Sequence, residues 1–267
     1  MVRVAMKKAE FEPPARVEGL IEIAGTDAAL GYIDVSLPFS TSHDSVTGDG
    51  HMLMDFSSLA GLLGGGDGGE LAGVFDRMEV RQIGDTAYVN FGLFNLLFGV
   101  ETPWLSMPVE DGQGFTQEFS SGVDPYNPTG YLKALGASGG DVTVIGTESL
   151  RGVATTHYRA IFDLETLARI DPAAFSELQE SAPVGLDDLP LDIWIDDANR
   201  VHRFVFELDG PALGEAQAGE SFDYMRVQFD FSDYGGRVTV EPPPADDVTD
   251  VSEIEDWFMG GLGEFDA

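Results

Sequence analysis

The sequence contains no cysteine, and this absence removes two kinds of chemistry. Without thiols the chain can form neither a disulfide framework nor a thiolate metal site. Histidine is also scarce, with four residues, and no two of them have the spacing of a metal-binding pair. We therefore expect no metal site and no cofactor.

Basic residues are the second shortage. Lys and Arg together number 14 against 47 Asp and Glu, which gives a formal net charge of −33. A chain this acidic repels phosphate backbones, so we expect no nucleic-acid partner. We interpret the excess acid as a solvated surface that resists aggregation, with a dedicated cation-binding role as the alternative.

Long apolar segments are missing too. No stretch reaches the ~18 consecutive apolar residues that a membrane-spanning helix needs. Residues 1–19 include basic side chains but no apolar core after them, so they do not read as a signal peptide. We expect either a cytosolic chain or one whose export signal is missing from this sequence.

What the sequence has is a series of short alternating segments separated by turn residues. The pattern predicts about ten or eleven strands, mostly in consecutive hairpins. The clearest hairpins turn at Gly84-Asp85, at Arg151-Gly152 and at Asp197-Ala198-Asn199. Residues 221–244 are expected to form one long last strand, with a break near 233–236.

Three segments have helical features. Val17, Leu20, Ile21 and Ala24 recur at helical spacing and predict a helix over 13–29. Residues 128–135 and 165–182 are the other two. Helices can pack on one face of a curled antiparallel sheet, which predicts an α+β half-barrel of about ten or eleven strands wrapped around about three helices.

Catalytic patterns are weak in this sequence. No G-x-S-x-G elbow occurs, and His157 lies in an expected strand with Thr155 on its face and Thr156 and Tyr158 on the other. We interpret His157 as a hydrogen-bonded structural residue and expect no catalytic residue. An enzyme would need two titratable side chains that converge in one pocket.

The acidic segment 187–199 invites a calcium interpretation. Calcium requires six to eight oxygen ligands from a loop of fixed spacing. Asp192 and Asp196 instead alternate along a strand, and Asp196-Asp197 begin a turn, where aspartate is common. We favour the turn over the metal site.

Apolar mass is concentrated in residues 91–104, which either fill the core or line a cavity for an apolar ligand. Strand alternation cannot tell which of two faces would line such a cavity. The candidate cavity residues, taken from this segment and from other aromatic or aliphatic positions, are Phe91, Phe94, Leu97, Phe98, Trp104, Tyr131, Leu132, Ile161, Trp194, Phe204 and Phe206.

The order of three segments is similar to that of a known family. The segments are RGVATTHYRAIFDLETL, LPLDIWIDDANRVHRFVFEL and FDFSDYGGRVTVEPPPADDVTD. Together they resemble the actinobacterial envelope lipoproteins of the LprG/LppX type, which belong to the LolA-like superfamily. Upstream segments around Tyr88 and Trp104 resemble the first half of the same family, so the resemblance covers residues 15–250.

The resemblance implies a LolA-like half-barrel with an apolar cavity between sheet and helices, and a non-enzymatic protein that binds or transports lipids or lipoglycans. It also implies an extracytoplasmic location in the cell envelope and contact with a membrane or an envelope transporter. The lipobox cysteine of such lipoproteins is absent here. The alternative is a structural or protein-interaction module of the envelope, on the same scaffold with no open cavity.

These expectations divide the chain into three parts. Residues 1–14 are an N-terminal tail, 15–245 a LolA-like lipid-binding domain, and 246–267 an acidic, glycine-rich C-terminal tail.

Overall fold

The computed structural model describes residues 14–27, 31–59, 74, 76–109, 142–163, 188–210 and 221–254. The chain divides into two units. Unit 1 comprises Met1–Ser40 and Phe119–Gly236, and unit 2 comprises Thr41–Glu118 and Arg237–Ala267. In both units the described residues are mostly strand, with little helix.

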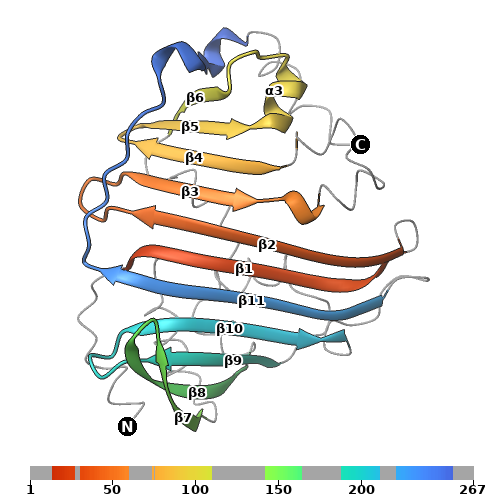
Figure 1. Ribbon diagram of the computed structural model, residues 1–267, viewed down its shortest axis with the longest axis vertical. Coiled ribbons are helices and arrows are strands. Elements are labelled where there is room, and N and C mark those ends of the chain that lie inside the picture. Colours follow the sequence, from red (N-terminus) through yellow and green to blue (C-terminus); the bar gives the residue numbers. More distant parts are fainter. Residues whose placement is uncertain are drawn as a thin grey trace. The chain divides into compact units, whose positions relative to one another are not determined.

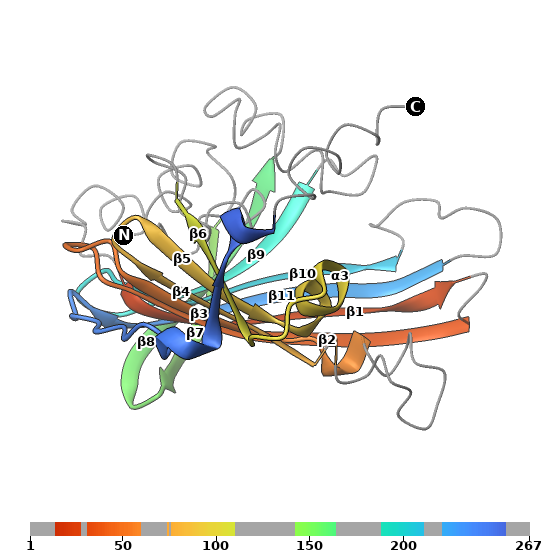
Figure 2. The ribbon, with the colours of Figure 1, turned by 90° about the horizontal axis from the view of Figure 1, so that it is seen from above.

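Unit 1 is built from long strands that lie side by side. They are β1 (Pro14–Asp27), β2 (Gly31–His43, which continues into unit 2), β7 (Val142–Leu150), β8 (Val153–Asp163), β9 (Asp188–Ile195), β10 (Val201–Asp209) and β11 (Ser221–Tyr234). Their order is β2-β1-β11-β10-β9-β8-β7 (Figure 1). The pairs β1–β11, β11–β10, β10–β9, β9–β8 and β8–β7 are antiparallel. Figure 2 shows β1, β2 and β11 running together along their length.

Unit 2 contains shorter strands and the α-helix. Its elements are β3 (Gly50–Asp55), β4 (Arg77–Ile83), β5 (Thr86–Phe91), α3 (Gly92–Phe98), β6 (Trp104–Pro108), β12 (Val248–Asp250) and two 3-10 helices, η2 (Ala245–Asp247) and η3 (Val251–Glu253). The strand order is β3-β4-β5-β6-β12. Strands β3 to β6 pair antiparallel, whereas β12 joins β6 in parallel.

Within unit 2, the buried side chain of Asp44 contacts Arg237 and Val238. Asp44 is 1% exposed and accepts hydrogen bonds from the backbone N–H groups of Val46 and Thr47. It also accepts from the Val238 N–H at 3.1 Å and pairs with Arg237 Nε at 2.9 Å. A carboxylate removed from water in this way needs such donors, so these contacts hold the chain after β11 in place.

The three predicted hairpins are confirmed. Strands β4 and β5 turn at Gly84, strands β7 and β8 at Arg151-Gly152, and strands β9 and β10 before Arg200. Arg151 and Gly152 both have positive φ, 51° and 83°, as a two-residue hairpin turn requires. The break predicted near 233–236 is confirmed, since β11 ends at Tyr234, but the predicted continuation of the strand is wrong, because residues 236–244 form no strand.

The predicted helix over 13–29 is wrong, because residues 14–27 form β1. Val17, Ile21 and Ala24 fit a helical spacing, but Val17, Gly19, Ile21 and Ile23 also alternate with the period of a strand. Strand β1 pairs with β11 from Pro14↔Tyr234 to Thr26↔Ser221. This long ladder satisfies the backbone groups and overrides the local pattern.

The other two predicted helices, 128–135 and 165–182, lie outside the described residues. Helix α3 falls within the apolar segment 91–104, for which the sequence pattern predicted no helix. The half-barrel and the helices over 128–135 and 165–182 therefore stay predictions. The described structure establishes the antiparallel sheets.

A close approach at Gly19 makes one position in β1 sensitive to size. A Cβ at Gly19 would stand 2.0 Å from Cζ of Phe39, whose ring packs edge-on against Phe229 with centroids 5.7 Å apart. We expect Gly19→Val to lower the free energy of unfolding by about 1–3 kcal/mol, because the Phe39 ring must move out of its packed position. Urea denaturation monitored by circular dichroism measures the change.

Gly146 in β7 supplies the matched control, because a Cβ there would have no atom within 4 Å. Gly146→Val should change the free energy of unfolding much less than Gly19→Val. Equal effects of the two substitutions would contradict the packing argument.

Candidate functional site

The two faces of the unit 1 sheet differ in polarity. The registers place Val17 opposite Phe231 and Phe204 opposite Phe229. Their side chains alternate with those of the opposite face along each strand. The buried members of the apolar face form one cluster: Val17, Ala160, Leu191, Ile193, Ile195, Val201, Phe204, Leu208, Phe229 and Phe231.

The apolar face includes both fully buried and half-buried side chains along β1, β10 and β11. Val17, Phe204 and Phe229 are at most 7% exposed. Further along the same strands, on the same face, Leu208 is also buried, but five other apolar side chains are only half-buried. We call these residues the apolar patch: Ile21, Ile23, Phe206, Met225 and Val227. They are neighbours, because Val227 pairs with both Ile21 and Phe206, and Met225 pairs with Ile23.

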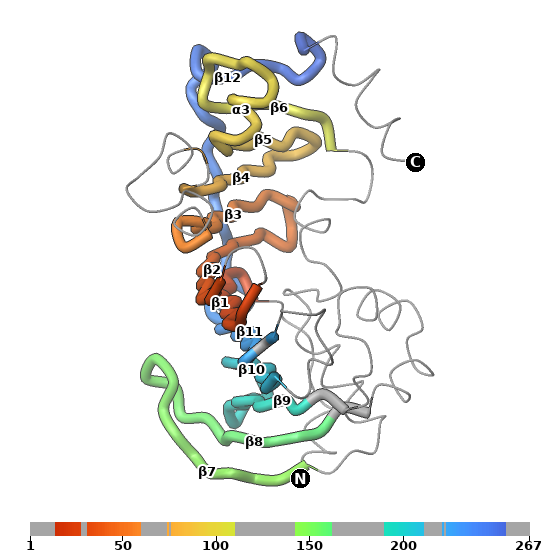
Figure 3. Tube along the Cα trace, turned by 90° about the vertical axis from the view of Figure 1, so that its right-hand side faces the viewer, coloured from red at the N-terminus to blue at the C-terminus, as the bar shows by residue number. Residues whose placement is uncertain are grey.

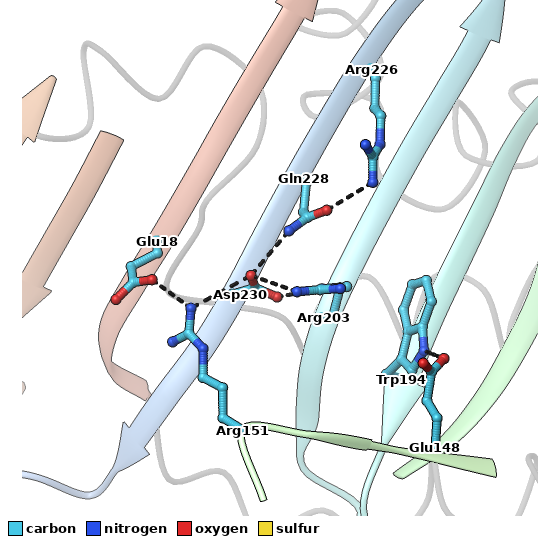
Figure 4. Close-up of polar contacts among 8 residues, drawn as sticks. All are labelled: Glu18, Glu148, Arg151, Trp194, Arg203, Arg226, Gln228 and Asp230. Carbon is cyan, nitrogen blue, oxygen red and sulfur yellow. Dashed lines mark hydrogen bonds and ion pairs between the residues drawn. The ribbon is translucent and has the colours of Figure 1, made fainter. Parts of the chain in front are cut away.

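The opposite face carries a network of charged side chains centred on Asp230 (Figure 4). Asp230 lies in β11 opposite Arg203 of β10. Arg203 donates to both carboxylate oxygens of Asp230, from Nε at 2.5 Å and from Nη2 at 2.9 Å. Gln228 also donates to Asp230, and Arg226 donates to Gln228. Forked arginine–carboxylate pairs of this kind fix the orientation of both groups.

The tip of the β7–β8 hairpin reaches the same network. Figure 3 shows β7 and β8 curving away from β9, β10 and β11. Arg151 in the hairpin turn donates from Nη2 to Glu18 Oε2 at 2.5 Å, and the same nitrogen is 3.6 Å from Asp230 Oδ2. Residues 133 positions apart are thereby joined, and the hairpin tip is held over the charged face of β1 and β11.

A pocket of about 510 Å³ lies beneath this hairpin tip. Its walls combine the tip with the ends of β1, β10 and β11. The lining residues are Arg16, Glu18, Leu150, Arg151, Val153, Arg200, His202, Arg203, Asp230, Phe231, Ser232, Asp233 and Tyr234. Four arginines therefore surround one pocket in a chain that has 14 basic residues. We call them the pocket arginines: Arg16, Arg151, Arg200 and Arg203.

Asp196 supports one wall of the pocket from behind. Its side chain is 2% exposed and contacts Arg200 Nε and His202 Nε2, each at 2.9 Å. Burial raises the pKa of the Asp196 carboxyl, but the hydrogen bonds from His202 and Arg200 lower this pKa by more than burial raises it. The pKa of Asp196 therefore lies below its ordinary value. The guanidinium of Arg200 also lies over the ring of Tyr234, 5.6 Å from its centroid.

Tyr234 closes the same wall. Its hydroxyl donates to the carbonyl of Val201. Burial raises the pKa of the Tyr234 phenol above its ordinary value, and the charge of Asp196 raises it further. The hydroxyl therefore stays protonated at neutral pH and keeps its hydrogen bond to the Val201 carbonyl.

His157 lies on the charged face, where its interpretation as a hydrogen-bonded residue is confirmed. Its Nε2 contacts Asp192 Oδ1 at 2.7 Å, and Arg159 donates to both oxygens of the same carboxylate. The imidazole stacks on Trp194 at 4.1 Å, and the Trp194 indole donates to Glu148. None of these residues lines the pocket beneath the hairpin tip.

Residues 196–199 of the acidic segment form the predicted turn. The backbone N–H of Asn199 donates to the Asp196 carbonyl, and the N–H of Arg200 donates to Asp196 Oδ1. Within the described ranges, no group of three or more His, Asp or Glu side chains is placed to hold a metal ion. The carboxylates of Asp192 and Asp196 are instead occupied by arginine and histidine partners.

The unit 1 candidates for a cavity lie on two different faces. Phe204 and Phe206 are on the apolar face, with ring centroids 6.2 Å apart. Trp194 is on the charged face, opposite His157. Ile161 shares the face of His157 by alternation and is 48% exposed. One cavity on one face therefore cannot include all four, and their role as ligand contacts stays a prediction.

The remaining candidates belong to unit 2 or lie outside the described residues. Phe91 and Phe94 pack edge-on at 5.3 Å, and Phe94 lies 5.7 Å from Phe98, while Leu97 is 61% exposed. Trp104 is buried, with the guanidinium of Arg81 4.6 Å from its ring centroid. Tyr131 and Leu132 fall in the part that the structure does not describe.

The pocket arginines were missed by the sequence analysis. Arg203 and Asp230 could have been matched once β10 and β11 were paired in register, because both lie on the polar side of their strands. The contact of Arg151 with Glu18 had no sequence signal, since it depends on how the hairpin curves. The alternation of residues along a strand predicts which face each side chain occupies, but it does not predict how a hairpin bends.

The described chain is thus a sheet-dominated protein, mostly β with little helix, whose unit 1 sheet has one apolar and one charged face. Among the described residues, no helix has both the length and the apolar character to cross a membrane. No protein-family model matches the sequence.

Two curated proteins of Streptomyces are similar in sequence. An uncharacterized 31.2 kDa protein in the rplA-rplJ intergenic region of Streptomyces griseus is 27% identical over 254 residues, which are 90% of this chain and 74% of that protein. A putative lipoprotein of Streptomyces coelicolor is 28% identical over 182 residues, 66% of this chain and 52% of that protein.

Solved structures with a similar arrangement include LprF from Mycobacterium bovis, with a TM-score of 0.45 and 14% identity over 91% of this chain and 96% of that one. The Mycobacterium tuberculosis lipoprotein LppX has a TM-score of 0.41 and 16% identity over 90% of this chain and 94% of that one. The resemblance to actinobacterial lipoproteins that the sequence motifs indicated is confirmed as a resemblance by the putative lipoprotein of Streptomyces coelicolor.

Proposed function

We propose that this chain is a non-enzymatic protein of the cell envelope that binds lipids or other apolar ligands. The observation that carries the proposal is the apolar patch of β1, β10 and β11, which adjoins the fully buried cluster on the same face of the sheet. The name of the Streptomyces coelicolor relative, a putative lipoprotein, supports a location in the envelope.

The half-buried side chains of the apolar patch suit a ligand with a long apolar chain. The fully buried side chains stabilise the sheet, whereas Phe206, Met225 and Val227 retain apolar surface that a ligand can cover. Each CH₂ group transferred from water to such a surface contributes about 0.8 kcal/mol. An acyl chain can therefore bind here without any specific polar contact, as expected for a carrier with a LolA-like half-barrel.

Phe206 offers the sharpest test of the ligand-binding face. We expect Phe206→Asp to weaken uptake of a fluorescent fatty acid by about tenfold, because a carboxylate in the apolar patch opposes burial of the acyl chain. Ile161→Asp is the matched control, since Ile161 lies on the opposite face of the same sheet. Phe206→Leu should retain most of the uptake, because it keeps the patch apolar.

Native mass spectrometry of the purified protein provides a second measurement, in which a co-purified lipid is expected. The proposal fails if no lipid co-purifies and the wild-type protein takes up no fatty acid. That result would favour a structural or protein-interaction module. If Ile161→Asp instead removes uptake and Phe206→Asp does not, the ligand binds on the charged face, where Trp194 is also located.

A further inference from the structure

We propose that the pocket beneath the β7–β8 hairpin tip binds a phosphate group, carried either by a small water-soluble molecule or by a lipid headgroup. This site is separate from the apolar patch, because Arg203, Asp230 and Glu18 lie on the opposite face of the unit 1 sheet. It therefore goes beyond the binding of an apolar ligand.

The first argument is the concentration of arginines, which outnumber the three carboxylates that line the same pocket, Glu18, Asp230 and Asp233. The chain has a net charge of −33 and 14 basic residues, yet the four pocket arginines line one pocket of about 510 Å³. Long-range repulsion opposes any anion that approaches such a chain. Salt screens this repulsion over about 8–10 Å, so cations in direct contact can outweigh it within a pocket. An anion site in this protein needs such a local group of arginines.

The second argument is the supply of hydrogen-bond donors. A guanidinium carries five N–H donors. Arg200 uses its Nε on Asp196, and Arg16 makes only a 3.9 Å ion pair from its Nε to Asp233. The terminal nitrogens of Arg16 and Arg200 have no hydrogen-bond partner among the described residues, and both side chains are about half exposed, at 56% and 45%.

The third argument is that the carboxylates of the pocket hold the arginines in position. Asp230 accepts hydrogen bonds from both Nε and Nη2 of Arg203. Glu18 and Asp230 form ion pairs with Arg151 at the hairpin tip (Figure 4). Arg200 is held by Asp196. Donors that are oriented before binding lose little conformational freedom when the ligand arrives. The ion pairs therefore prepare the site as well as neutralise part of its charge.

The geometry favours phosphate over a single carboxylate. The pocket arginines come from β1, the hairpin turn and the start of β10, so their donors approach from several directions. A phosphate group presents oxygens in a tetrahedral arrangement and can accept from several guanidinium groups together. A carboxylate presents two oxygens in one plane, which one arginine fork already satisfies.

Calorimetric titration with inorganic phosphate, at constant ionic strength, tests the site directly. We expect saturable binding by the wild-type protein, weakened about tenfold by Arg16→Gln and by Arg200→Gln, because each removes a charged donor. Arg159→Gln is the control, since Arg159 lies on the same sheet face but outside the pocket. Arg16→Gln breaks only the long ion pair with Asp233, and circular dichroism should confirm that its fold is unchanged.

Co-flotation with phosphatidylcholine vesicles that contain phosphatidic acid separates the two sources of phosphate. If the wild-type protein floats with the vesicles and both pocket variants do not, the site binds a lipid headgroup. If the wild-type protein does not float but binds phosphate in the calorimeter, and both variants lose that binding, the site binds a soluble phosphate ester. The proposal is overturned if binding is absent in both measurements, or if Arg159→Gln weakens it as much as the pocket variants. Fatty-acid uptake by Arg16→Gln should remain normal, which distinguishes failure of this site from failure of the apolar patch.

Discussion

Replacing Phe204 with alanine should lower the free energy of unfolding by about 3–5 kcal/mol, the largest effect that we expect from a single substitution. Phe204 is 1% exposed and packs edge-on against Phe231, with ring centroids 5.8 Å apart. Removal of the ring leaves a cavity among the side chains on the apolar face. Because β10 is paired with both β9 and β11, the backbone cannot move far to fill that cavity. Urea denaturation monitored by circular dichroism measures the change in the free energy of unfolding.

Ile161→Ala is the matched control for this prediction. Ile161 is 48% exposed, so its loss should cost much less, of the order of a few tenths of a kcal/mol. If the two substitutions have similar effects, Phe204 does not occupy the centre of the core. Phe204→Leu should recover part of the lost stability, because a leucine side chain fills part of the cavity.

The second large effect is expected at Asp196. Asp196→Ala should lower the free energy of unfolding by about 2–3 kcal/mol, because the buried carboxylate accepts from the Arg200 backbone, the Arg200 side chain and His202. Loss of the acceptor leaves these donors without their partner beside the pocket. Asp197→Ala is the control, since Asp197 is exposed in the same turn.

The contribution of Asp196 should also depend on pH. Its folded-state pKa lies below the ordinary value of 3.8, so the folded state binds its proton less readily than the unfolded state. The stability that Asp196 supplies is therefore fully present above that value and is lost as the pH falls through the folded-state pKa. Denaturation of the wild-type protein at pH 7 and at about pH 3 should show a larger acid loss than Asp196→Ala does. Equal losses would contradict this assignment.

Hairpins were the part of the fold that the sequence predicted well. Gly84-Asp85, Arg151-Gly152 and Asp197-Ala198-Asn199 are short turns whose chemistry is local, and alternation on both sides of each turn sets the strand period. The helix predicted over 13–29 failed because the same residues satisfy two periods. Pairing with β11, which lies some 200 residues away in the chain, selects the strand.

The candidate site was predictable only in part. Phe204 and Phe206 were correctly expected to share a side of their strand, because residues two apart in a strand face the same way. Ile161 and Trp194 were grouped with them by composition, although their strands turn these side chains to the charged face. The register between neighbouring strands decides which of their side chains share a face of the sheet. Amino-acid composition carries no information about that register.

By itself, the sequence determined the strand-rich character of this protein, its large excess of acidic residues and the positions of its hairpin turns, because these depend on residue type and on local spacing. Only the tertiary structure decided that Arg151 meets Glu18 and Asp230, and that the pocket arginines converge. These contacts arise from a hairpin that curves over neighbouring strands. Each of them joins residues that are far apart in the chain, and the spacing of residues along one strand does not encode such a contact.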